Sequence, residues 1–337
     1  MVELGRRGAA AMRTASPSSS SFLGRRWSLR LRQLSVGSAK IRLLLCFCIA
    51  FYVILLTAGL WQPSSHLGST PPPGKCYTVV INTWKRNDLL KQSVIHYASC
   101  AGVDSIHIVW SEPNPPTNSL RDDLSQAAKS NSQGGRDVEV RFDVNLEDSL
   151  NNRFKEIKDL RTNAIFSIDD DVIFPCSSVE FAFTVWRSAP TTMVGFVPRV
   201  HWSDKSGTII ENYRYGGWWS VWWMGSYSMI LSKAAFFHKQ YLDLYTNHMP
   251  AFIRDYVTEN RNCEDIAMSL LVANVTDAPP IWVKGRIFEI GSTGISSLGG
   301  HSGRRSQCLN VFAEIYGGMP LVASSVKAID SRRSWFW

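Results

Sequence analysis

Three consecutive aspartates, Asp169–Asp171, are the residues of this sequence with the clearest chemical potential. They follow an apolar run, Ala164–Ile168, and an apolar pair comes after them. In an extended chain, residues i and i+2 point the same way, so Asp169 and Asp171 are expected on one side and Asp170 on the other. Neighbouring carboxylates repel one another unless a cation neutralises them. The triplet therefore predicts either a metal site or a solvated acidic turn, since short motifs recur by chance.

A metal held by these carboxylates has predictable properties. An all-oxygen ligand set suits a hard ion such as Mg²⁺ or Mn²⁺. An ion bound by few protein ligands keeps positions open for phosphate oxygens and can stabilise a diphosphate leaving group. The triplet thus suggests chemistry on a phosphorylated substrate.

Strand and helix patterns alternate along the chain before the triplet. Strands are predicted at 77–83, 105–110, 138–144 and 164–168, and helices at 88–99 and 149–160. Such alternation predicts a mostly parallel sheet flanked by helices, here within one α/β domain over 76–337.

Ligands of parallel sheets bind beyond the carboxyl ends of the strands. Each predicted strand of this chain is followed by polar residues: Asn82 and Arg86, then Ser111 and Glu112, then Asp148 and Arg153, and last the acidic triplet. One crevice can therefore collect all of them.

Two later segments allow more than one interpretation. Glu264 and Asp265 open an apolar helical stretch, 266–273, where acids either stabilise the helix dipole or face a substrate. Four tryptophans in GGWWSVWWMG can stack on sugar, lie at a membrane interface or pack in the core. We expect part of this group in the core; its members are Trp218, Trp219, Trp222 and Trp223.

The net charge of +8 lies entirely in the N-terminal tail. Residues 1–42 hold nine Lys/Arg and one acid, whereas the remaining 295 residues hold 27 basic and 27 acidic groups. Because the folded body carries no excess positive charge, nucleic-acid binding lacks its main electrostatic support.

The N-terminal quarter of the chain predicts a membrane protein. Residues 43–61 form 19 uncharged, mostly apolar positions, nearly enough to cross a hydrocarbon core of about 30 Å. Basic residues before such a segment stay cytosolic. We therefore expect a disordered cytosolic tail at 1–42, a single-pass type II anchor at 43–61, a Pro-rich stem at 62–75 and a lumenal body.

A lumenal body can contain disulfides and glycans. Five of the seven cysteines lie there (Cys76, Cys100, Cys176, Cys263 and Cys308), and an odd number leaves at least one free or paired between chains. The spacing does not settle the pairing. Asn274-Val275-Thr276 is a potential N-glycosylation site.

Several motifs in order resemble glycosyltransferase family 64, which includes the C-terminal domains of exostosins and the exostosin-like hexosaminyltransferases. The resemblance covers about 76–330 and rests on the runs CYTVVINTWKRNDLL, SLNNRF, SIDDDVIF, VGFVPR, NCEDIAMS and RRSQCLN. It implies a GT-A fold, a nucleotide-sugar donor, Mn²⁺ as cofactor and retention of anomeric configuration.

The resemblance also implies roles for individual residues. Nucleotide contacts fall on Asn82, Arg86, Ser111, Asp148 and Arg153. Asp169 and Asp170 belong to the nucleotide-sugar site, and Asp171 and Asp169 become the metal ligands. Glu264 and Asp265 lie near the reacting carbon, Arg305 contacts the diphosphate, and Cys263 pairs with Cys308.

Four departures from the exostosin-like hexosaminyltransferases affect the donor. Those enzymes have Gln, Asn, Asn and Asp where this chain has Asn82, Ser111, Asp148 and Glu264. Because three of these positions touch the base, ribose or sugar, a uridine hexosaminyl donor does not follow from the resemblance, and a guanosine-linked mannose becomes plausible. With GDP-mannose as the favoured donor, the resemblance leads us to expect a Golgi enzyme that moves mannose to a glycosylinositol phosphorylceramide lipid.

Three alternatives remain at this point. The same fold can use a UDP-N-acetylhexosamine donor on a glycan or protein acceptor. It can also serve as a non-enzymatic, lectin-like binder. A metal-dependent phosphotransferase is disfavoured because the chain lacks a GxxxxGK[ST] phosphate loop.

Overall fold

The structure, a computed structural model, describes residues 39–60, 76–133, 136–204, 212–291 and 301–333. The chain divides into two compact units, Met1–Leu67 and Gly68–Trp337, and each is described by itself. In the first unit, helix α2 spans Ala39–Leu60.

The predicted membrane-spanning helix at 43–61 is not confirmed. Helix α2 covers most of that range, yet among the described residues no helix combines the length and the apolar character required to cross a membrane. The predicted tail, apart from the first residues of α2, and the predicted stem at 62–75 lie outside the described residues.

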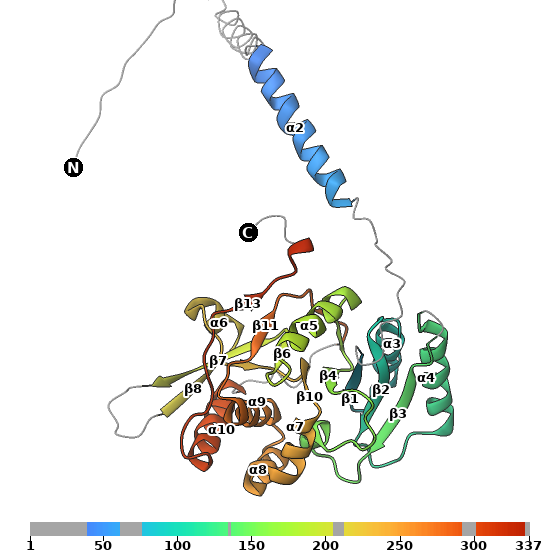
Figure 1. The fold of residues 1–337 in the computed structure, drawn as a ribbon, viewed down its shortest axis with the longest axis vertical. Coiled ribbons are helices and arrows are strands. Elements are labelled where there is room, and N and C mark those ends of the chain that lie inside the picture. The colour runs from blue at the N-terminus through green and yellow to red at the C-terminus, as the bar shows by residue number, and fades with distance from the viewer. Residues whose placement is uncertain (1–38, 61–75, 134–135, 205–211, 292–300, 334–337) are drawn as a thin grey trace, which may run out of the picture. The chain divides into compact units, whose positions relative to one another are not determined.

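The second unit is built on an eight-stranded sheet in the order β13-β11-β6-β10-β4-β1-β2-β3 (Figure 1). Its strands are β1 (Tyr77–Thr83), β2 (Val103–Trp110), β3 (Glu139–Val144), β4 (Ala164–Asp169), β6 (Val194–Gly195), β10 (Ala234–His238), β11 (Ile281–Val283) and β13 (Lys327–Ala328). Every neighbouring pair is parallel except those of β10, which runs antiparallel to β4 and β6. The predicted mixed α/β fold with a mostly parallel sheet is confirmed.

Two layers of helices cover the two faces of this sheet. One apolar cluster joins it to α3 (Asn87–Ala98), α4 (Asn118–Asn131) and α5 (Cys176–Ser188). The other cluster joins it to α7 (Gln240–Asp243), α8 (Ala251–Asn260), α9 (Glu264–Thr276) and α10 (His301–Ile315). In β1, Val79 and Ile81 enter the first cluster and Val80 the second, as the alternation of a strand requires.

Smaller elements surround the sheet. A three-stranded antiparallel sheet consists of β8 (Asn212–Gly216), β7 (Pro198–Asp204) and β9 (Met229–Ile230), and β5 (Val172–Ile173) pairs with β12 (Phe288–Glu289). The short helices are η1 (Leu150–Phe154), α6 (Trp218–Met224), η2 (Leu244–His248) and η4 (Ser331–Arg333).

The four predicted strands and the helix predicted at 88–99 are confirmed, but α4 was not predicted. The helix predicted at 149–160 is wrong, because only the 3-10 turn η1 forms there before the chain becomes extended at Lys155. The Ser149 hydroxyl accepts from the Asn151 N–H, and the Asn152 side chain donates to the Ser111 hydroxyl and the Glu147 carbonyl. Such side-chain hydrogen bonds compete with a regular helix.

Candidate active site

The acidic triplet lies at the carboxyl end of β4, with its central residue turned inward. Asp170 is fully buried and accepts a hydrogen bond of 2.6 Å from the Thr83 hydroxyl. The side chains of Asp169 and Asp171 are 24% and 20% exposed, in agreement with the predicted alternation. Burial raises the pKa of Asp170 to about 6, although Thr83 and Arg86 oppose that shift.

Arg86 holds the triplet from the start of α3. Its guanidinium lies 2.5 Å from Asp170 Oδ1 and 2.7 Å from Asp171 Oδ2. The two carboxylates raise the pKa of Arg86 even though its partial burial lowers it. Arg86, which is predicted to contact the nucleotide, therefore also fixes the side chains of Asp170 and Asp171.

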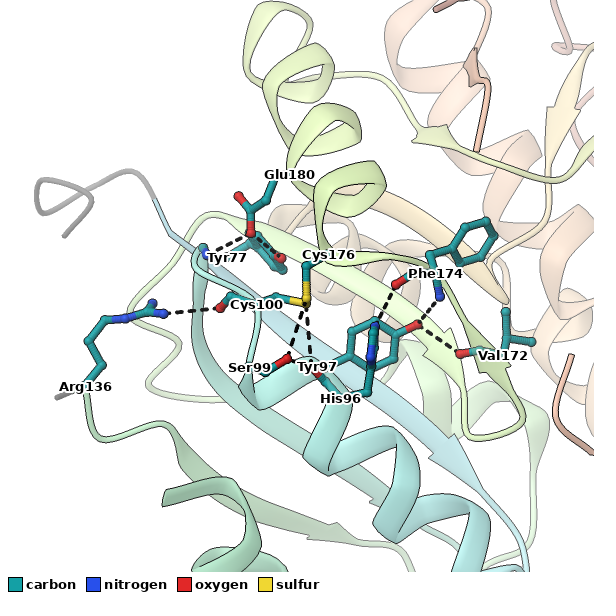
Figure 2. The surroundings of a disulfide bond; sticks show 11 residues. Tyr77, His96, Tyr97, Ser99, Cys100, Arg136, Val172, Phe174, Cys176 and Glu180 are labelled. Atoms are coloured by element: carbon teal, nitrogen blue, oxygen red, sulfur yellow. Dashed lines mark hydrogen bonds between the residues drawn. A yellow bond between two sulfur atoms is a disulfide. The ribbon is translucent and has the colours of Figure 1, made fainter. Parts of the chain in front are cut away.

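The other end of α3 holds the chain that follows the triplet (Figure 2). The Tyr97 hydroxyl donates to the Val172 carbonyl at 2.9 Å, and the His96 ring donates to the Phe174 carbonyl at 2.7 Å. A disulfide joins Cys100 to Cys176, a pairing that the sequence left open. The closeness of His96 to these two sulfurs is thus explained by the disulfide. Both ends of α3 consequently position the triplet.

A second set of charges connects β4 to the first turn of α9. Arg153 is buried and forms an ion pair with Asp169, and it donates to the Ser232 hydroxyl at 3.1 Å. The Ser232 backbone N–H donates to Asp265 Oδ1 at 2.8 Å, and its hydroxyl donates to the same oxygen. Ser232 precedes β10, whose antiparallel direction brings its beginning to the carboxyl end of β4.

Arg305 completes this set from α10. Its guanidinium lies 3.5 Å from Asp265 Oδ2 and donates to the Tyr215 hydroxyl at 2.8 Å. Its Nε is buried with no hydrogen-bond partner among the described residues. This cation therefore retains a donor for a further acceptor.

The two acids of α9 titrate in opposite directions. Burial raises the pKa of Asp265, but Arg305, Arg153 and the Ser232 hydrogen bonds outweigh burial and lower it overall. Burial, followed by the charge of Asp265, raises the pKa of Glu264 to about 7. Glu264 Oε2 is buried and without a hydrogen-bond partner in the described part of the chain. The pair thus holds one firmly ionised carboxylate and one that titrates near neutrality.

The disulfide between Cys263 and Cys308 is present as predicted. It connects the residue before α9 to the middle of α10, so Asp265 and Arg305 are held on neighbouring helices. Two hydrogen bonds between Asn310 and Tyr213 similarly attach α10 to β8, which carries Tyr215.

The remaining predicted nucleotide contacts lie at the ends of β1 and β2 and in the loop after β3. Asn82 is half-buried and aligned with Asp169 of β4. The Ser111 hydroxyl accepts from Asn152, and Asp148 forms an ion pair of 2.7 Å with Arg261. Arg153 is only 4% exposed and already paired, so it faces the acids rather than open solvent.

The donor set fits a hard divalent cation. Asp169 and Asp171 each use one carboxylate oxygen in a described ion pair, with Arg153 and Arg86 respectively. The other oxygen of each has no hydrogen-bond or ion-pair partner among the described residues. Two carboxylates plus substrate phosphates are a common ligand set for Mg²⁺, and Mn²⁺ accepts the same oxygen donors.

Sequence reasoning missed Thr83 and Ser232, and Tyr215 was not among the predicted site residues. Thr83 continues the alternation of β1, so its inward direction could have been read from the strand pattern. Ser232 had no such signal, because its position depends on the antiparallel pairing of a distant strand. Asn274, the predicted glycosylation site, is exposed near the end of α9.

Comparison with known proteins defines the class. Residues 77–335 match the Glycosyl transferase family 64 domain, so the chain belongs to that family and is a glycosyltransferase.

Two plant proteins and one animal protein illustrate its relatives. The chain is 60% identical over 318 residues to "Glycosylinositol phosphorylceramide mannosyl transferase 1" of Arabidopsis thaliana, covering 93% of this chain and 95% of that protein. It is 31% identical to "Exostosin-like 2" of Mus musculus, over 74% of this chain and 75% of that protein. It is 33% identical to "Glucosamine inositolphosphorylceramide transferase 1" of Oryza sativa subsp. indica, over 81% of this chain but 34% of that protein.

Proposed function

We propose that this protein is a Mn²⁺-dependent, retaining mannosyltransferase of the GT-A type that transfers mannose from GDP-mannose to glycosylinositol phosphorylceramide. The observation that carries the proposal is the 60% identity, over nearly both full lengths, to the Arabidopsis protein whose name states a glycosylinositol phosphorylceramide mannosyl transferase. The acidic triplet and the cluster of Asp265 and Arg305 supply a site of suitable chemistry.

The acceptor class has a second line of support. The rice relative, at 33% identity, is named a glucosamine inositolphosphorylceramide transferase. The names of the two plant relatives thus state different sugars, and both contain inositol phosphorylceramide. We infer that the acceptor is glycosylinositol phosphorylceramide and that the sugar is set by residues around the donor.

At the donor phosphates, Asp169 and Asp171 are the residues that would hold Mn²⁺. The bound ion would neutralise the charge that develops on the departing diphosphate. Arg305, which is paired with Asp265, is the cation that we propose to add a charge-assisted hydrogen bond to the same oxygens. Arg86 keeps the carboxylates in place from the protein side.

At the sugar, Asp265 supplies negative charge. Its lowered pKa keeps it ionised at neutral pH. A fixed carboxylate near the reacting carbon can stabilise the positive charge of an oxocarbenium-like transition state. Ser232 orients this carboxylate through two hydrogen bonds to one oxygen, which leaves the second oxygen to Arg305.

For location, we propose a type II protein of the Golgi membrane with a lumenal body. The uncharged run at 43–61 behind nine basic residues supports this orientation. The two disulfides of the body suit an oxidising compartment.

The test is transfer by the full chain to glycosylinositol phosphorylceramide in detergent with Mn²⁺. Labelled GDP-mannose is expected to give a labelled glycolipid whose new bond has the anomeric configuration of the donor. Labelled UDP-N-acetylglucosamine is expected to give none. A product from the UDP sugar alone would replace the mannose assignment with the hexosaminyl alternative, and an absence of any transfer would favour a lectin-like binder.

A further inference from the structure

An exposed tryptophan face on α6 has no role in the site described above. Trp218, Trp219, Trp222 and Trp223 are 53%, 80%, 61% and 82% exposed, so the expectation that part of this group is core is wrong. Tryptophan is usually highly buried, and a contiguous exposed apolar patch marks a site of interaction.

The helix is built to present these side chains outward. At about 100° per residue, the four tryptophans occupy an arc of about 140° on one side of α6. Val221 lies on the opposite side, and it is the one buried residue of the helix. Ring contacts run along the face, with centroids 6.2 to 6.4 Å apart between successive members.

The size of this tryptophan face points to an interaction surface. At about 150–250 Å² for each indole, its exposed fractions amount to roughly 400–700 Å². This reaches or exceeds the largest apolar patch of an ordinary monomer, about 300–600 Å².

Basic residues lie on the neighbouring edge of the main sheet. Two residues after α6 and its glycine cap, Tyr227 bonds to Ser324 and, through its hydroxyl, to the Val326 carbonyl at 2.6 Å. Val326 is 68% exposed, and Lys327 beside it lies 3.6 Å from the centre of the Trp282 ring. Neither Lys284 nor Lys327 has a carboxylate within 4.0 Å in the described part of the chain. Burial and then the charge of Lys284 lower the pKa of Lys327.

We propose that the tryptophan face of α6 docks on the surface of the lipid bilayer, with Lys284 and Lys327 beside anionic head groups. Indoles prefer the head-group region of a membrane, and basic side chains gain energy near anionic lipids. Protein interfaces are enriched in arginine as well as in aromatic residues, whereas α6 carries no arginine.

The inference rests on the proposed membrane-bound function and extends it. An anchor at 43–61, as proposed above, would tether the body to a membrane. Tyr215, whose hydroxyl bonds Arg305, lies three residues before α6. Docking through α6 would therefore bring the Arg305 side of the site toward the head groups of a lipid acceptor.

The experiment is tryptophan fluorescence of the full chain reconstituted in vesicles of phosphatidylcholine and phosphatidylinositol, without donor or acceptor. Subtracting the spectrum of the Trp219→Ala/Trp223→Ala variant from that of the wild type isolates the two most exposed indoles. With brominated phosphatidylcholine as quencher, their emission is expected to fall by about half or more, as is typical of indoles placed at the interface. Phe252→Ala, an exposed aromatic of α8, is the matched control and should leave the quenching unchanged.

The opposite result is equally clear. If brominated lipid does not quench the emission obtained by subtraction, the proposal is overturned. The proposal is also overturned if this emission changes only on adding a soluble inositol glycan, because the tryptophan face would then bind sugar. Donor turnover, measured separately in detergent, tests the proposed function. A chain that fails to transfer mannose but shows quenching would refute that function and leave the docking surface intact.

Discussion

At the scale of single residues, the site depends on fixed charges that compensate one another. Asp265 receives two hydrogen bonds from Ser232 and faces Arg305, and Arg153 lies between Ser232 and Asp169. Burying an unpaired ion costs folding free energy. Each of these residues therefore stabilises its neighbour's charge in addition to any contact with the substrate.

Asp265→Asn tests the role of this carboxylate. The amide oxygen can still accept from Ser232, but the negative charge that we propose to act beside the reacting carbon is lost. The kcat of mannosyl transfer should fall by roughly 100-fold or more, with a smaller effect on the KM for the donor.

Asp255→Asn is the control for that substitution, because Asp255 is an exposed acid of α8. The Asp255→Asn substitution should leave kcat and the KM for the donor unchanged. Wild-type kcat in a folded Asp265→Asn enzyme would remove Asp265 from the mechanism.

The Glu264→Gln substitution tests the raised pKa of the buried Glu264 carboxyl group. The pKa of Glu264 is raised from 4.5 to about 7, so between these values the folded state holds a proton that the unfolded state has released. The free energy of unfolding therefore falls as the pH rises from about 4.5 to about 7, stays at the lower value above pH 7, and recovers on acidification. Gln does not titrate, so the variant should be more stable than the wild type at about pH 8, on the order of 1–3 kcal/mol, and should lose that advantage near pH 5.

Urea denaturation at both pH values, with chelator present, measures this difference. Glu314→Gln, on the exposed side of α10, is the matched control and should show no such pH dependence. An identical pH profile for wild type and Glu264→Gln would mean that Glu264 keeps an ordinary pKa.

At the scale of elements, α3 and the pair α9–α10 each position one half of the site. Helix α3 fixes the triplet from both ends: Arg86 directly precedes it, and His96 and Tyr97 lie in its last turn. Cys100, two residues after the helix, adds the disulfide to Cys176. Helices α9 and α10 are connected by the Cys263–Cys308 disulfide next to Asp265 and Arg305.

Removing each disulfide should therefore have a different effect on activity. Cys100→Ala/Cys176→Ala should raise the Mn²⁺ concentration needed for half-maximal transfer, whereas Cys263→Ala/Cys308→Ala should mainly lower kcat. Both should cost about 2–5 kcal/mol of unfolding free energy, because they open loops of 76 and 45 residues.

The two variants serve as controls for each other in Mn²⁺ titrations and denaturation curves. Equal effects on metal dependence and kcat would show that the disulfides act only through global stability.

Local patterns in the sequence predicted the first four strands and α3 because each carries its own period of apolar residues. The triplet was predicted as a site because three adjacent acids after a buried strand need neutralisation. The position of Ser232 could not be predicted, since it depends on β10 pairing antiparallel with a strand far away in the chain. The helix predicted at 149–160 does not form for a related reason. Hydrogen bonds and ion pairs with distant segments override the local helical preference of these residues.

At the scale of the whole molecule, both apolar clusters are built from residues between Tyr77 and Ala328. The unit Gly68–Trp337 thus contains a complete core on each face of its sheet. The excess positive charge of the chain lies outside this unit, in residues 1–42.

A chain beginning at Gly68 should therefore fold with the thermal midpoint of the full-length protein and hydrolyse the donor at a similar rate in detergent. Differential scanning calorimetry and nucleotide release measure the two properties. A truncated chain that unfolds well below the full-length midpoint would show that the first unit contributes to the core.

The central claim is that the acids at the end of β4 hold a divalent ion that binds the diphosphate of the donor. Calorimetric titration of the full chain with GDP-mannose tests it most directly, with Mn²⁺, after chelation, and in the variant Asp169→Asn/Asp171→Asn. We predict binding that weakens by roughly 100-fold on chelation, and a variant that binds equally weakly with and without Mn²⁺. Wild-type affinity that chelation leaves unchanged would contradict the account.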